Sequence, residues 1–304
     1  MSARFGNVLT AMVTPFDENG VLDLDVARDL ARFLVDHGNQ GLVVTGTTGE
    51  APALSDDEKI SLWAAVAEAV NVPVIAGAGT NDTAHSAHLA REAERVGAAG
   101  VLAVGPYYNR PSQAGIEGHM RAIAAATTLP IMMYDIPVRT GRKMTTATML
   151  RLAREVTNIV ALKDAAGNPG ETAGLISSAP EGFEVYSGDD PMTLPLLAVG
   201  AVGTVGVATH WTGDDHQQMF GLLEKGDLEG ARLVNARMLE SFAFETGDET
   251  PNPLPSKAML RTFGMKVGQA RLPMGDAPDW LEPRAVEVWT NLLRWRESFP
   301  KRPM

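Results

Sequence analysis

A pattern of a short apolar run, a polar or glycine-rich turn and a longer segment with helical spacing recurs from Asn7 to about residue 225. Short continuous apolar runs are typical of parallel strands covered on both faces, whereas an amphipathic helix shows its apolar residues every three to four positions. The alternation therefore predicts repeated βα units and an α/β fold. The predicted strands are Val8–Val13, Gly41–Val44, Val74–Ala76, Gly100–Val104, Ile131–Tyr134, Ile159–Lys163, Glu184–Tyr186 and Gly203–Val207.

The segments between these strands have the spacing of amphipathic helices. Ser55 is followed three residues later by Glu58, a capping box that satisfies exposed amides at a helix start. The predicted helices are Leu24–Asp36, Ser55–Val70, Thr83–Val96, Gly115–Thr127, Thr145–Glu155, Pro169–Ser177, Pro191–Val199 and Asp215–Lys225. After residue 225 only helical patterns follow, in Asp227–Glu245, Ser256–Phe263 and Glu282–Glu297. We therefore predict a barrel domain over residues 1–225 and a C-terminal helical extension over residues 226–304.

Eight strands that alternate with helices match a (β/α)8 TIM barrel, but a doubly wound sheet has the same alternation. In a barrel, reactive residues cluster in the loops that follow the strands. Polar residues do follow four of the predicted strands, in Thr45–Glu50, Gly105–Arg110 and Tyr134–Gly141 and at Lys163. This placement favours the barrel and predicts one site at the carboxyl ends of its strands.

Composition and charge narrow the possible functions. The 304 residues are 45% hydrophobic and carry a formal net charge of -11, without any block rich in Lys and Arg. Nothing in such a chain would neutralise a phosphate backbone, so we expect no nucleic-acid partner. Cysteine is absent, which excludes disulfides and thiolate metal ligands. No apolar run approaches the ~20 residues of a membrane span, and residues 1–6 lack a signal peptide's apolar segment, so we expect a cytoplasmic protein without a membrane partner.

The strongest candidate for chemistry is Lys163, which ends the apolar run Ile159–Leu162 and precedes the turn Asp164–Gly167. Partial burial of this amine would disfavour its charged form and lower the lysine pKa, leaving a usable neutral fraction near pH 7. A neutral amine can attack a ketone and form an imine. The alternative is a structural lysine that forms a salt bridge with Asp164 or another carboxylate.

Three other features at the predicted mouth each have a structural and a functional interpretation. Thr45–Glu50 is either a tight turn or an anion cradle of backbone amides and threonine hydroxyls, and it lacks the lysine of a nucleotide-binding loop. Tyr108 and Tyr134 are either packing aromatics or, beside a lysine and a threonine, members of a proton relay. Arg139 either pairs with a surface carboxylate or clamps a substrate carboxylate with two hydrogen bonds.

Two further sets of charged residues argue against other chemistries. Asp189 and Asp190 follow the seventh predicted strand, a common phosphate position in barrels, and their carboxylates would repel a phosphorylated substrate. His85 and His88 share a helix face, but no third ligand accompanies them. We therefore expect solvated histidines and no metal site.

Taken together, these motifs resemble the dihydrodipicolinate synthase and N-acetylneuraminate lyase superfamily of class I, Schiff-base-forming enzymes. The order and spacing of the motifs make the resemblance specific, and it covers nearly the whole chain. The motifs are Leu9–Phe16, Gly46–Glu50, Pro73–Gly77, Gly105–Pro111, Tyr134–Pro137, Leu162–Lys163, Ser187–Asp190, Pro251–Lys257 and Arg271–Met274. The resemblance implies a (β/α)8 barrel with a C-terminal helical extension.

The resemblance also implies roles for individual residues. Lys163 would form the imine with pyruvate, and Tyr134 would transfer protons, linked through Thr47 to Tyr108 of a neighbouring subunit. The backbone amides of Thr47 and Thr48 would hold the pyruvate carboxylate. The implied substrate-binding residues are Thr48, Arg139, Gly188 and Val205. No metal or organic cofactor is implied, and the expected assembly is a homotetramer built from tight dimers.

Arg139 favours the synthase branch of this superfamily, which condenses pyruvate with L-aspartate-4-semialdehyde on the route to lysine, because sialate lyases typically lack an arginine there. Departures from the synthase pattern at Gly105, Ala166 and Thr204–Gly206 leave the second substrate open. The alternatives are a related pyruvate-dependent 2-oxo acid aldolase, a sialate or keto-deoxy sugar acid lyase, and a non-catalytic 2-oxo acid sensor. The presence of the candidate lysine and tyrosine disfavours the sensor.

Feedback by free lysine is common among these synthases, and the sequence predicts weak or no inhibition here. His85 stands where lysine-sensitive enzymes have a glutamate for the inhibitor's α-ammonium. Asp56 and Lys59 stand where two histidines commonly frame the inhibitor's side chain. Asn81 and Tyr107 match the sensitive pattern and could still meet the inhibitor's carboxylate.

Overall fold

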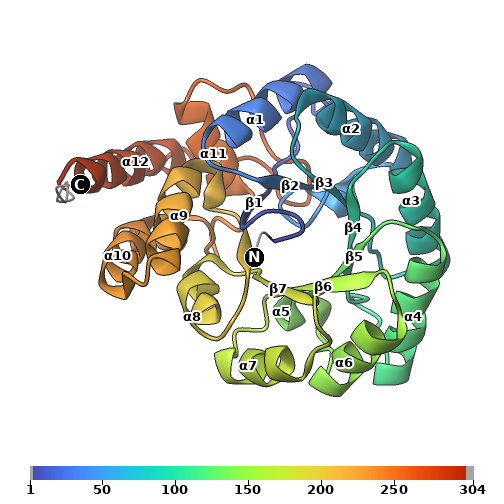
Figure 1. Ribbon diagram of the computed structural model, residues 1–304. Helices are drawn as coiled ribbons and strands as arrows, with labels where there is room; N and C mark the ends of the chain where they lie inside the picture. The colour runs from blue at the N-terminus through green and yellow to red at the C-terminus, as the bar shows by residue number, and fades with distance from the viewer. Residues whose placement is uncertain (1–2, 299–304) are drawn as a thin grey trace.

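Eight parallel strands close into a single barrel in the computed structural model, which describes residues 3–298 (Figure 1). The strands pair in chain order, and the last pairs with the first, so the barrel prediction is confirmed and an open doubly wound sheet is excluded. The strands are β1 Val8–Ala11, β2 Gly41–Val44, β3 Val74–Gly77, β4 Gly100–Val104, β5 Ile131–Asp135, β6 Ile159–Asp164, β7 Glu184–Ser187 and β8 Gly203–Gly206.

Helices between successive strands form a ring around the barrel (Figure 1). Ser55 caps one of them as predicted: its hydroxyl accepts from the Glu58 amide, and the Glu58 carboxylate accepts from the Ser55 amide. The helices are α1 Leu24–Asp36, α2 Asp56–Ala69, α3 Thr83–Arg95, α4 Gln113–Ala125, α6 Thr146–Glu155, α7 Pro169–Ser178, α8 Thr193–Ala198 and α9 Thr209–Glu224.

The structure differs from the predicted pattern mainly in the loops after strands. Two of these loops contain short helical turns that were not predicted, η1 Ala51–Ala53 and α5 Pro137–Thr140, whereas η2 Asp190–Met192 and α8 together occupy the predicted helix Pro191–Val199. Helix α9 begins at Thr209 and not at Asp215. Its first turns are buried on every side, so no alternation of polar and apolar residues marks them in the sequence.

Apolar strand residues pack in two directions, which explains why their runs are continuous. In β2, Leu42 and Val44 face the ring of helices, whereas Val43 points into the barrel interior with Ile75 and Leu102. All five side chains are at most 3% exposed. Burying each such side chain contributes roughly 1.5–3 kcal/mol, so both faces of the sheet are needed to hold the strand ends in place.

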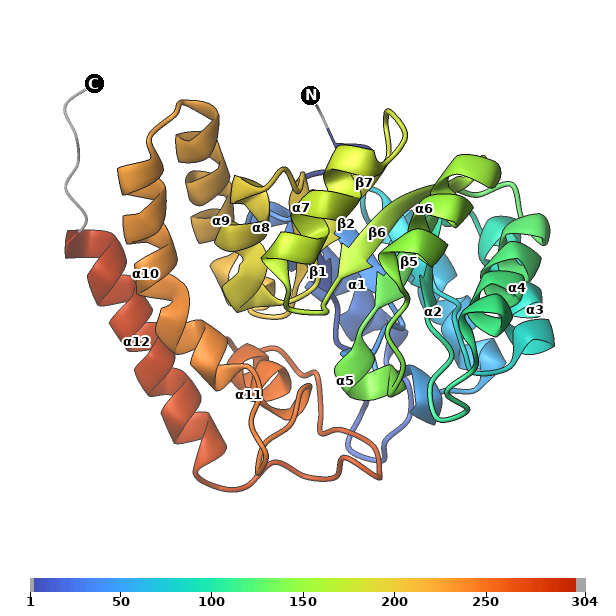
Figure 2. The same cartoon turned by 90° about the horizontal axis from the view of Figure 1, so that it is seen from below.

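The C-terminal residues add three more helices, α10 Leu228–Phe244, α11 Leu254–Thr262 and α12 Leu281–Ser298. They share a second apolar cluster with α9, and Figure 2 shows α10 and α12 beside α9 at one side of the barrel. Buried Asp215 of α9 forms ion pairs of 2.5 Å with Arg237 of α10 and with Arg296 of α12. The predicted helical extension is thus present and is fixed to the barrel through α9, while residues 299–304 of that prediction lie outside the described part.

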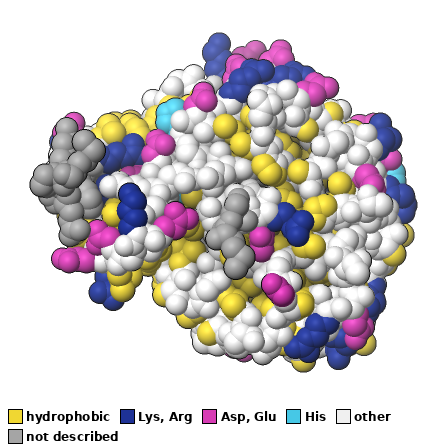
Figure 3. Space-filling view, viewed as in Figure 1, with side chains coloured by type: hydrophobic (Ala, Val, Ile, Leu, Met, Phe, Trp, Pro, Cys, Tyr) yellow, Lys and Arg dark blue, Asp and Glu magenta, His cyan; other side chains and the backbone are white. Residues whose placement is uncertain are grey.

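Charge on the surface is mixed in sign. Figure 3 shows Lys and Arg side chains interspersed with Asp and Glu around the visible face, without a continuous basic patch on that face. Across residues 3–298, no helix has the length and apolar character needed to cross a membrane.

Candidate active site

A cavity of about 570 Å³ opens at the carboxyl ends of the strands, where the sequence placed the reactive residues. Its wall combines side chains from the barrel loops with a segment that follows α10 in the C-terminal extension. The residues that line it include Thr47, Thr48, Tyr134, Arg139, Lys163, Gly188, Asp189, Val207, Glu245 and Asn252. Residues of three of the four predicted loops therefore meet in one space, whereas the loop Gly105–Arg110 contributes Tyr107 only to an adjacent pocket.

Lys163 and Tyr134 are direct neighbours across the paired strands β6 and β5. The amine nitrogen lies 4.4 Å from the centre of the tyrosine ring, and each residue is only 4% exposed. Burial lowers the pKa of Lys163 to about 8, although the negative charge of Asp190 opposes the shift. At that pKa about a tenth of the amine is neutral at pH 7, far more than for an exposed lysine.

The structural alternative for Lys163 was a salt bridge with Asp164, and the geometry does not support it. The Asp164 carboxylate instead accepts hydrogen bonds from the Thr172 hydroxyl at 2.6 Å and from the Ala166 amide at 2.9 Å. Within residues 3–298, no carboxylate oxygen lies within 4.0 Å of the Lys163 nitrogen. The amine is therefore buried without a direct ionic partner, as a nucleophile requires.

Tyr134 is held as a neutral phenol. Burial raises its pKa to about 12, while the charge of Arg139 and a hydrogen bond with the Thr47 side chain act in the opposite direction. A phenol with this pKa keeps its proton at neutral pH and can donate it to a leaving oxygen. The Thr47 side chain thus acts on the Tyr134 phenol, and the proposed proton relay through it stays a prediction.

Gly188 is required by the close approach of the lysine. A methyl group on its α-carbon would lie 2.8 Å from Cγ and 2.9 Å from Cε of Lys163. Its amide donates to the Asp164 carbonyl at 2.8 Å, which continues the pairing of β7 with β6. The absence of a side chain here lets the amine reach the cavity.

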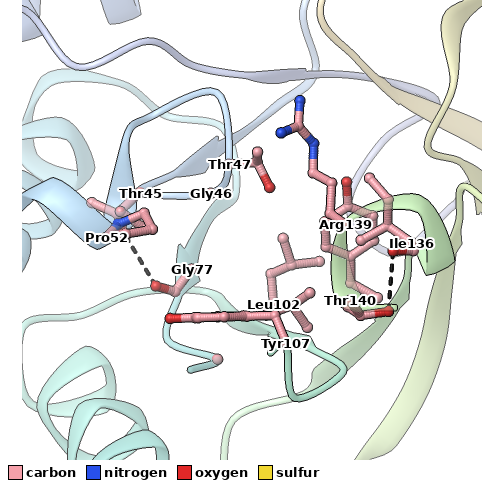
Figure 4. Close-up of a pocket in the computed structure, with 14 residues that line it drawn as sticks. Thr45, Gly46, Thr47, Pro52, Gly77, Leu102, Tyr107, Ile136, Arg139 and Thr140 are labelled. Atoms are coloured by element: carbon pink, nitrogen blue, oxygen red, sulfur yellow. Dashed lines mark hydrogen bonds between the residues drawn. The ribbon is translucent and has the colours of Figure 1, made fainter. Parts of the chain in front are cut away.

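The loop Thr45–Glu50 is strained and strongly anchored. Thr45 and Glu50 have positive φ angles of 59° and 56°, which are unusual for residues with side chains. The Thr45 hydroxyl donates to the Gly77 carbonyl at 3.1 Å (Figure 4) and accepts from the indole of Trp63 at 2.8 Å. Glu50 forms a buried ion pair of 2.7 Å with Lys257 of α11. Contacts with the barrel and with the C-terminal extension therefore maintain a conformation that the loop would not adopt alone.

Two backbone amides in this loop point to anion binding. Neither the Thr47 nor the Thr48 amide donates to an acceptor within the described chain. The Thr48 hydroxyl, which is 2% exposed, accepts a hydrogen bond of 2.9 Å from the side chain of Asn252. Two adjacent amides beside the cavity form the kind of concavity that binds a carboxylate.

Arg139 belongs to the short helix α5 and extends toward the loop that carries Thr47 (Figure 4). It lines both the main cavity and the adjacent pocket of about 230 Å³. Among the described residues no carboxylate forms an ion pair with it. The guanidinium is therefore available to a substrate carboxylate, and the surface-pair interpretation does not apply within the subunit.

Two predicted residues lie elsewhere in the subunit. Tyr108 is 89% exposed with a φ angle of 69°, and it does not line the cavity, whereas its neighbour Tyr107 lines the adjacent pocket. Val205 is fully buried among the side chains of the barrel interior, and Val207, two residues further on, reaches the cavity wall. Tyr108 is thus not part of the cavity wall in one subunit, and its role in a neighbouring subunit stays a prediction.

The prediction that His85 is solvated is wrong. Its Nε2 lies 2.8 Å from Oδ1 of Asp56, and the amine of Lys59 lies 3.6 Å from the same oxygen. His88 is exposed, as predicted. The reason for the difference is that α2 and α3 are neighbours in the ring, which the spacing on α3 alone does not reveal. In residues 3–298 no group of three His, Asp or Glu residues could hold a metal ion.

Glu245 and Asn252 line the cavity but were not predicted as site residues. Asn252 falls within the Pro251–Lys257 motif, which carried part of the family resemblance and could have indicated it. Glu245 directly follows α10 and has no distinguishing pattern around it. Both come from the extension, so only its packing against the barrel places them here.

A closed parallel barrel with a cavity at the carboxyl ends of its strands is the architecture of TIM-barrel enzymes, whose active sites lie at that face. The chain belongs to the dihydrodipicolinate synthetase family, whose model matches residues 4–285. The predicted superfamily is thereby confirmed.

Named relatives agree with this membership. The 4-hydroxy-tetrahydrodipicolinate synthase of Moorella thermoacetica is 50% identical over 273 residues, covering 89% of this chain and 92% of that protein. The enzyme of the same name from Acidothermus cellulolyticus is 50% identical over 278 residues, covering 90% and 88%. The crystal structure of the dihydrodipicolinate synthase from Cyanidioschyzon merolae with lysine bound is 40% identical, with a TM-score of 0.92 and coverage of 96% and 99%.

Proposed function

We propose that this lyase condenses pyruvate with L-aspartate-4-semialdehyde to 4-hydroxy-tetrahydrodipicolinate, in lysine and diaminopimelate biosynthesis. The relatives that match most of the chain carry the name of this activity. The observation that carries the proposal is the buried, unpaired amine of Lys163 beside the phenol of Tyr134. An assay that compares the semialdehyde with sialate and keto-deoxy sugar acids tests the choice of second substrate.

The first half of the reaction follows from the lysine and the tyrosine. The neutral amine of Lys163 attacks the ketone carbon of pyruvate, and the carbonyl oxygen becomes a hydroxyl. Tyr134 donates a proton to that hydroxyl, which leaves as water, and a cationic imine remains on Lys163. Withdrawal of electrons by the imine lets the Tyr134 phenolate take a methyl proton, which restores the phenol, and the resulting enamine carbon attacks the aldehyde carbon. The imine forms from the substrate itself, so the proposed chemistry uses no metal or organic cofactor.

The two substrates bring two carboxylates, and the cavity offers a separate group for each. The free amides of Thr47 and Thr48 lie at the loop beside the tyrosine, where they support binding of the pyruvate carboxylate. Arg139 lies on the short helix α5 and lines the cavity, where its guanidinium can donate two hydrogen bonds to the carboxylate of the semialdehyde. Gly188 and the backbone near Val205 complete the proposed pyruvate side of the site.

The assembly and organisation of the chain are part of the proposal. We propose a homotetramer of tight dimers in which Tyr108 reaches the Tyr134 and Thr47 of a neighbouring subunit, since it is exposed in its own subunit. Residues 1–225 form the proposed catalytic barrel and residues 226–304 the proposed extension. The predicted cytoplasmic location stays a prediction.

Lys163 is expected to form a borohydride-reducible imine with pyruvate, with trapping that increases as pH rises through about 8 because the neutral amine reacts. Intact-mass and peptide analysis after reduction locates the adduct. Lys163→Arg, which keeps the charge but cannot form the imine, is the control. An unmodified Lys163 peptide in the native enzyme would contradict the mechanism.

Arg139→Ala is expected to leave pyruvate trapping intact and to lower kcat/KM for the semialdehyde. Loss of a charged hydrogen-bond partner costs roughly 1.5–3 kcal/mol, which corresponds to about tenfold to a hundredfold or more. Arg142→Ala is the matched control, because Arg142 is a nearby exposed arginine whose side chain donates a hydrogen bond of 3.2 Å to the Arg110 carbonyl. Unchanged semialdehyde kinetics in Arg139→Ala would favour the sugar-acid lyases.

Mixing Tyr108→Phe subunits with Lys163→Arg subunits is expected to restore activity that neither variant has alone. If Tyr108 serves the neighbouring subunit, each mixed dimer contains one site with both native residues, so random exchange restores about a quarter of native activity. Activity is measured after dissociation and reassembly of a one-to-one mixture. If mixed dimers are shown to form but no activity is recovered, Tyr108 belongs to its own subunit's site or lies outside the chemistry.

Free lysine is expected to inhibit weakly or not at all at about 1 mM. The pocket lined by Tyr107 and Asn81 presents Asp56, whose carboxylate is already engaged by His85 and Lys59. Burial raises the pKa of Asp56, but the hydrogen bond with His85 and the charge of His85 lower that pKa on balance. The ionised Asp56 carboxylate is therefore already paired with His85 and offers no unpaired charge to the ammonium group of free lysine. A steady-state titration with lysine is the measurement. Strong inhibition that Tyr107→Ala removes would show that the pocket binds lysine despite these residues.

A further inference from the structure

Two buried carboxyl groups that the proposed mechanism does not use lie together beside Lys163. Asp190 begins η2 after strand β7 and is 1% exposed. Glu245 follows the last residue of α10, is 5% exposed and lines the same cavity as Lys163. Carboxyl groups are seldom this deeply buried without a partner, so their surroundings need an explanation.

The backbone after β8 holds the two carboxyl groups next to each other. The amide of Val207 donates to Oδ2 of Asp190 at 2.7 Å, and the next amide, of Ala208, donates to Oε2 of Glu245 at 2.9 Å. A methyl group at Gly206 would lie 2.6 Å from Oδ1 of Asp190, so the glycine provides the room for this approach. Consecutive amides thus fix one carboxyl from the barrel and one from the extension.

Burial, followed by the negative charge of Asp190 and a side-chain hydrogen bond with it, raises the pKa of Glu245 well above that of a free carboxyl. Ionised carboxylates only accept hydrogen bonds, so a bond between two carboxyl groups requires one of them to carry a proton. Oδ1 of Asp190 receives no hydrogen bond from an amide, hydroxyl or amine in residues 3–298. A proton shared with Glu245 would give this buried oxygen the donor that it otherwise lacks.

The other titratable groups around the pair do not supply that proton. Nε2 of His216 lies 4.0 Å from Oδ1 of Asp190, but Nδ1 of His216 donates to the Thr212 carbonyl, which leaves Nε2 without a proton in the neutral ring. Asp189 adds further negative charge beside the pair. Lys163 is acted on by both carboxyl groups of the pair, and the positive charge of Arg139 acts on it in the opposite direction.

We propose that Glu245 is a positioning residue for the lysine: it shares a single proton with Asp190, so that the pair presents one negative charge to Lys163. This inference rests on the proposed imine chemistry. One charge offsets the burial of the cationic imine without holding the free amine permanently as an ammonium ion. Two charges would favour the ammonium and suppress attack on pyruvate, and no charge would leave a buried cation uncompensated.

Because Glu245 belongs to the segment that follows α10, the proposal gives the C-terminal extension a part in the chemistry of the barrel. The packing of α10 on α9 places the carboxyl group, and the amide of Ala208 at the start of α9 orients it. The charge state at Lys163 thus depends on whether the extension is docked.

The test measures the pKa of Lys163, from the pH dependence of borohydride trapping with pyruvate, in Glu245→Gln, Asp190→Asn and the double variant. Both amides keep an oxygen that can accept from the Ala208 and Val207 backbone. If the pair shares one proton, each single variant retains one negative charge and leaves the Lys163 pKa nearly unchanged. The double variant has no charge, and its Lys163 pKa falls by about one unit or more.

Other patterns overturn the proposal. Two ionised carboxylates would give a fall in each single variant and about twice that fall in the double variant, whereas a neutral pair would give no fall in any variant. A fall in Asp190→Asn alone would assign the charge to Asp190 without sharing. Glu249→Gln, at an exposed glutamate in the same segment, is the control and is expected to change nothing.

A second measurement does not depend on catalysis or on the stability of the double variant. Infrared spectra of the native enzyme without pyruvate are expected to contain the carbonyl stretch of a buried protonated carboxyl at pH 7, and Glu245→Gln is expected to lack it. The same band in native and Glu245→Gln protein, or no such band in the native protein, would refute the shared proton. Failure of native trapping with the band present would instead refute the imine chemistry.

Discussion

The burial of the Lys163 amine is the constraint on which the rest of the site depends. Its strand neighbours Tyr134 and Tyr186 lie on either side in register, and Gly188 leaves space for the side chain. Removing an amine from water lowers its pKa, which creates the nucleophile, but the imine that follows is cationic in the same place. The site must therefore exclude water from the amine and still provide a compensating charge.

The anion-binding loop shows how the extension supports the barrel. Thr45 and Glu50 hold backbone conformations that few residues with side chains adopt, so the loop needs external contacts. Lys257 and the amide of Arg271 both bind the Glu50 carboxylate, at 2.7 Å and 2.8 Å. Asn252 binds the Thr48 hydroxyl. The extension is thus a structural part of the site. Glu245, which also belongs to the extension, lines the same cavity as Asn252 and Thr48.

Features that depend on neighbours in sequence were predicted well, and features that depend on packing were not. The capping box at Ser55 and the apolar strand that carries Lys163 are local patterns, and the structure has both, although the strand continues to Asp164. The contact of His85 with Asp56 was not predicted, because it joins two helices that the sequence does not show to be adjacent. The start of α9 at Thr209 was missed because a helix buried on all sides has no amphipathic pattern.

The sequence by itself determined the order of strands and helices, the family and the lysine near the end of β6, and it favoured the barrel over a doubly wound sheet, which the closure of β8 on β1 then excluded. It did so because apolar periodicity and motif spacing are local properties of the chain. Only the tertiary structure decided which charges meet. The amine lacks an ionic partner because Thr172 engages Asp164, and Glu245 reaches Asp190 because α10 packs against α9. A carboxyl group's protonation depends on burial and on groups far away in sequence, so no reading of the chain in order could assign it.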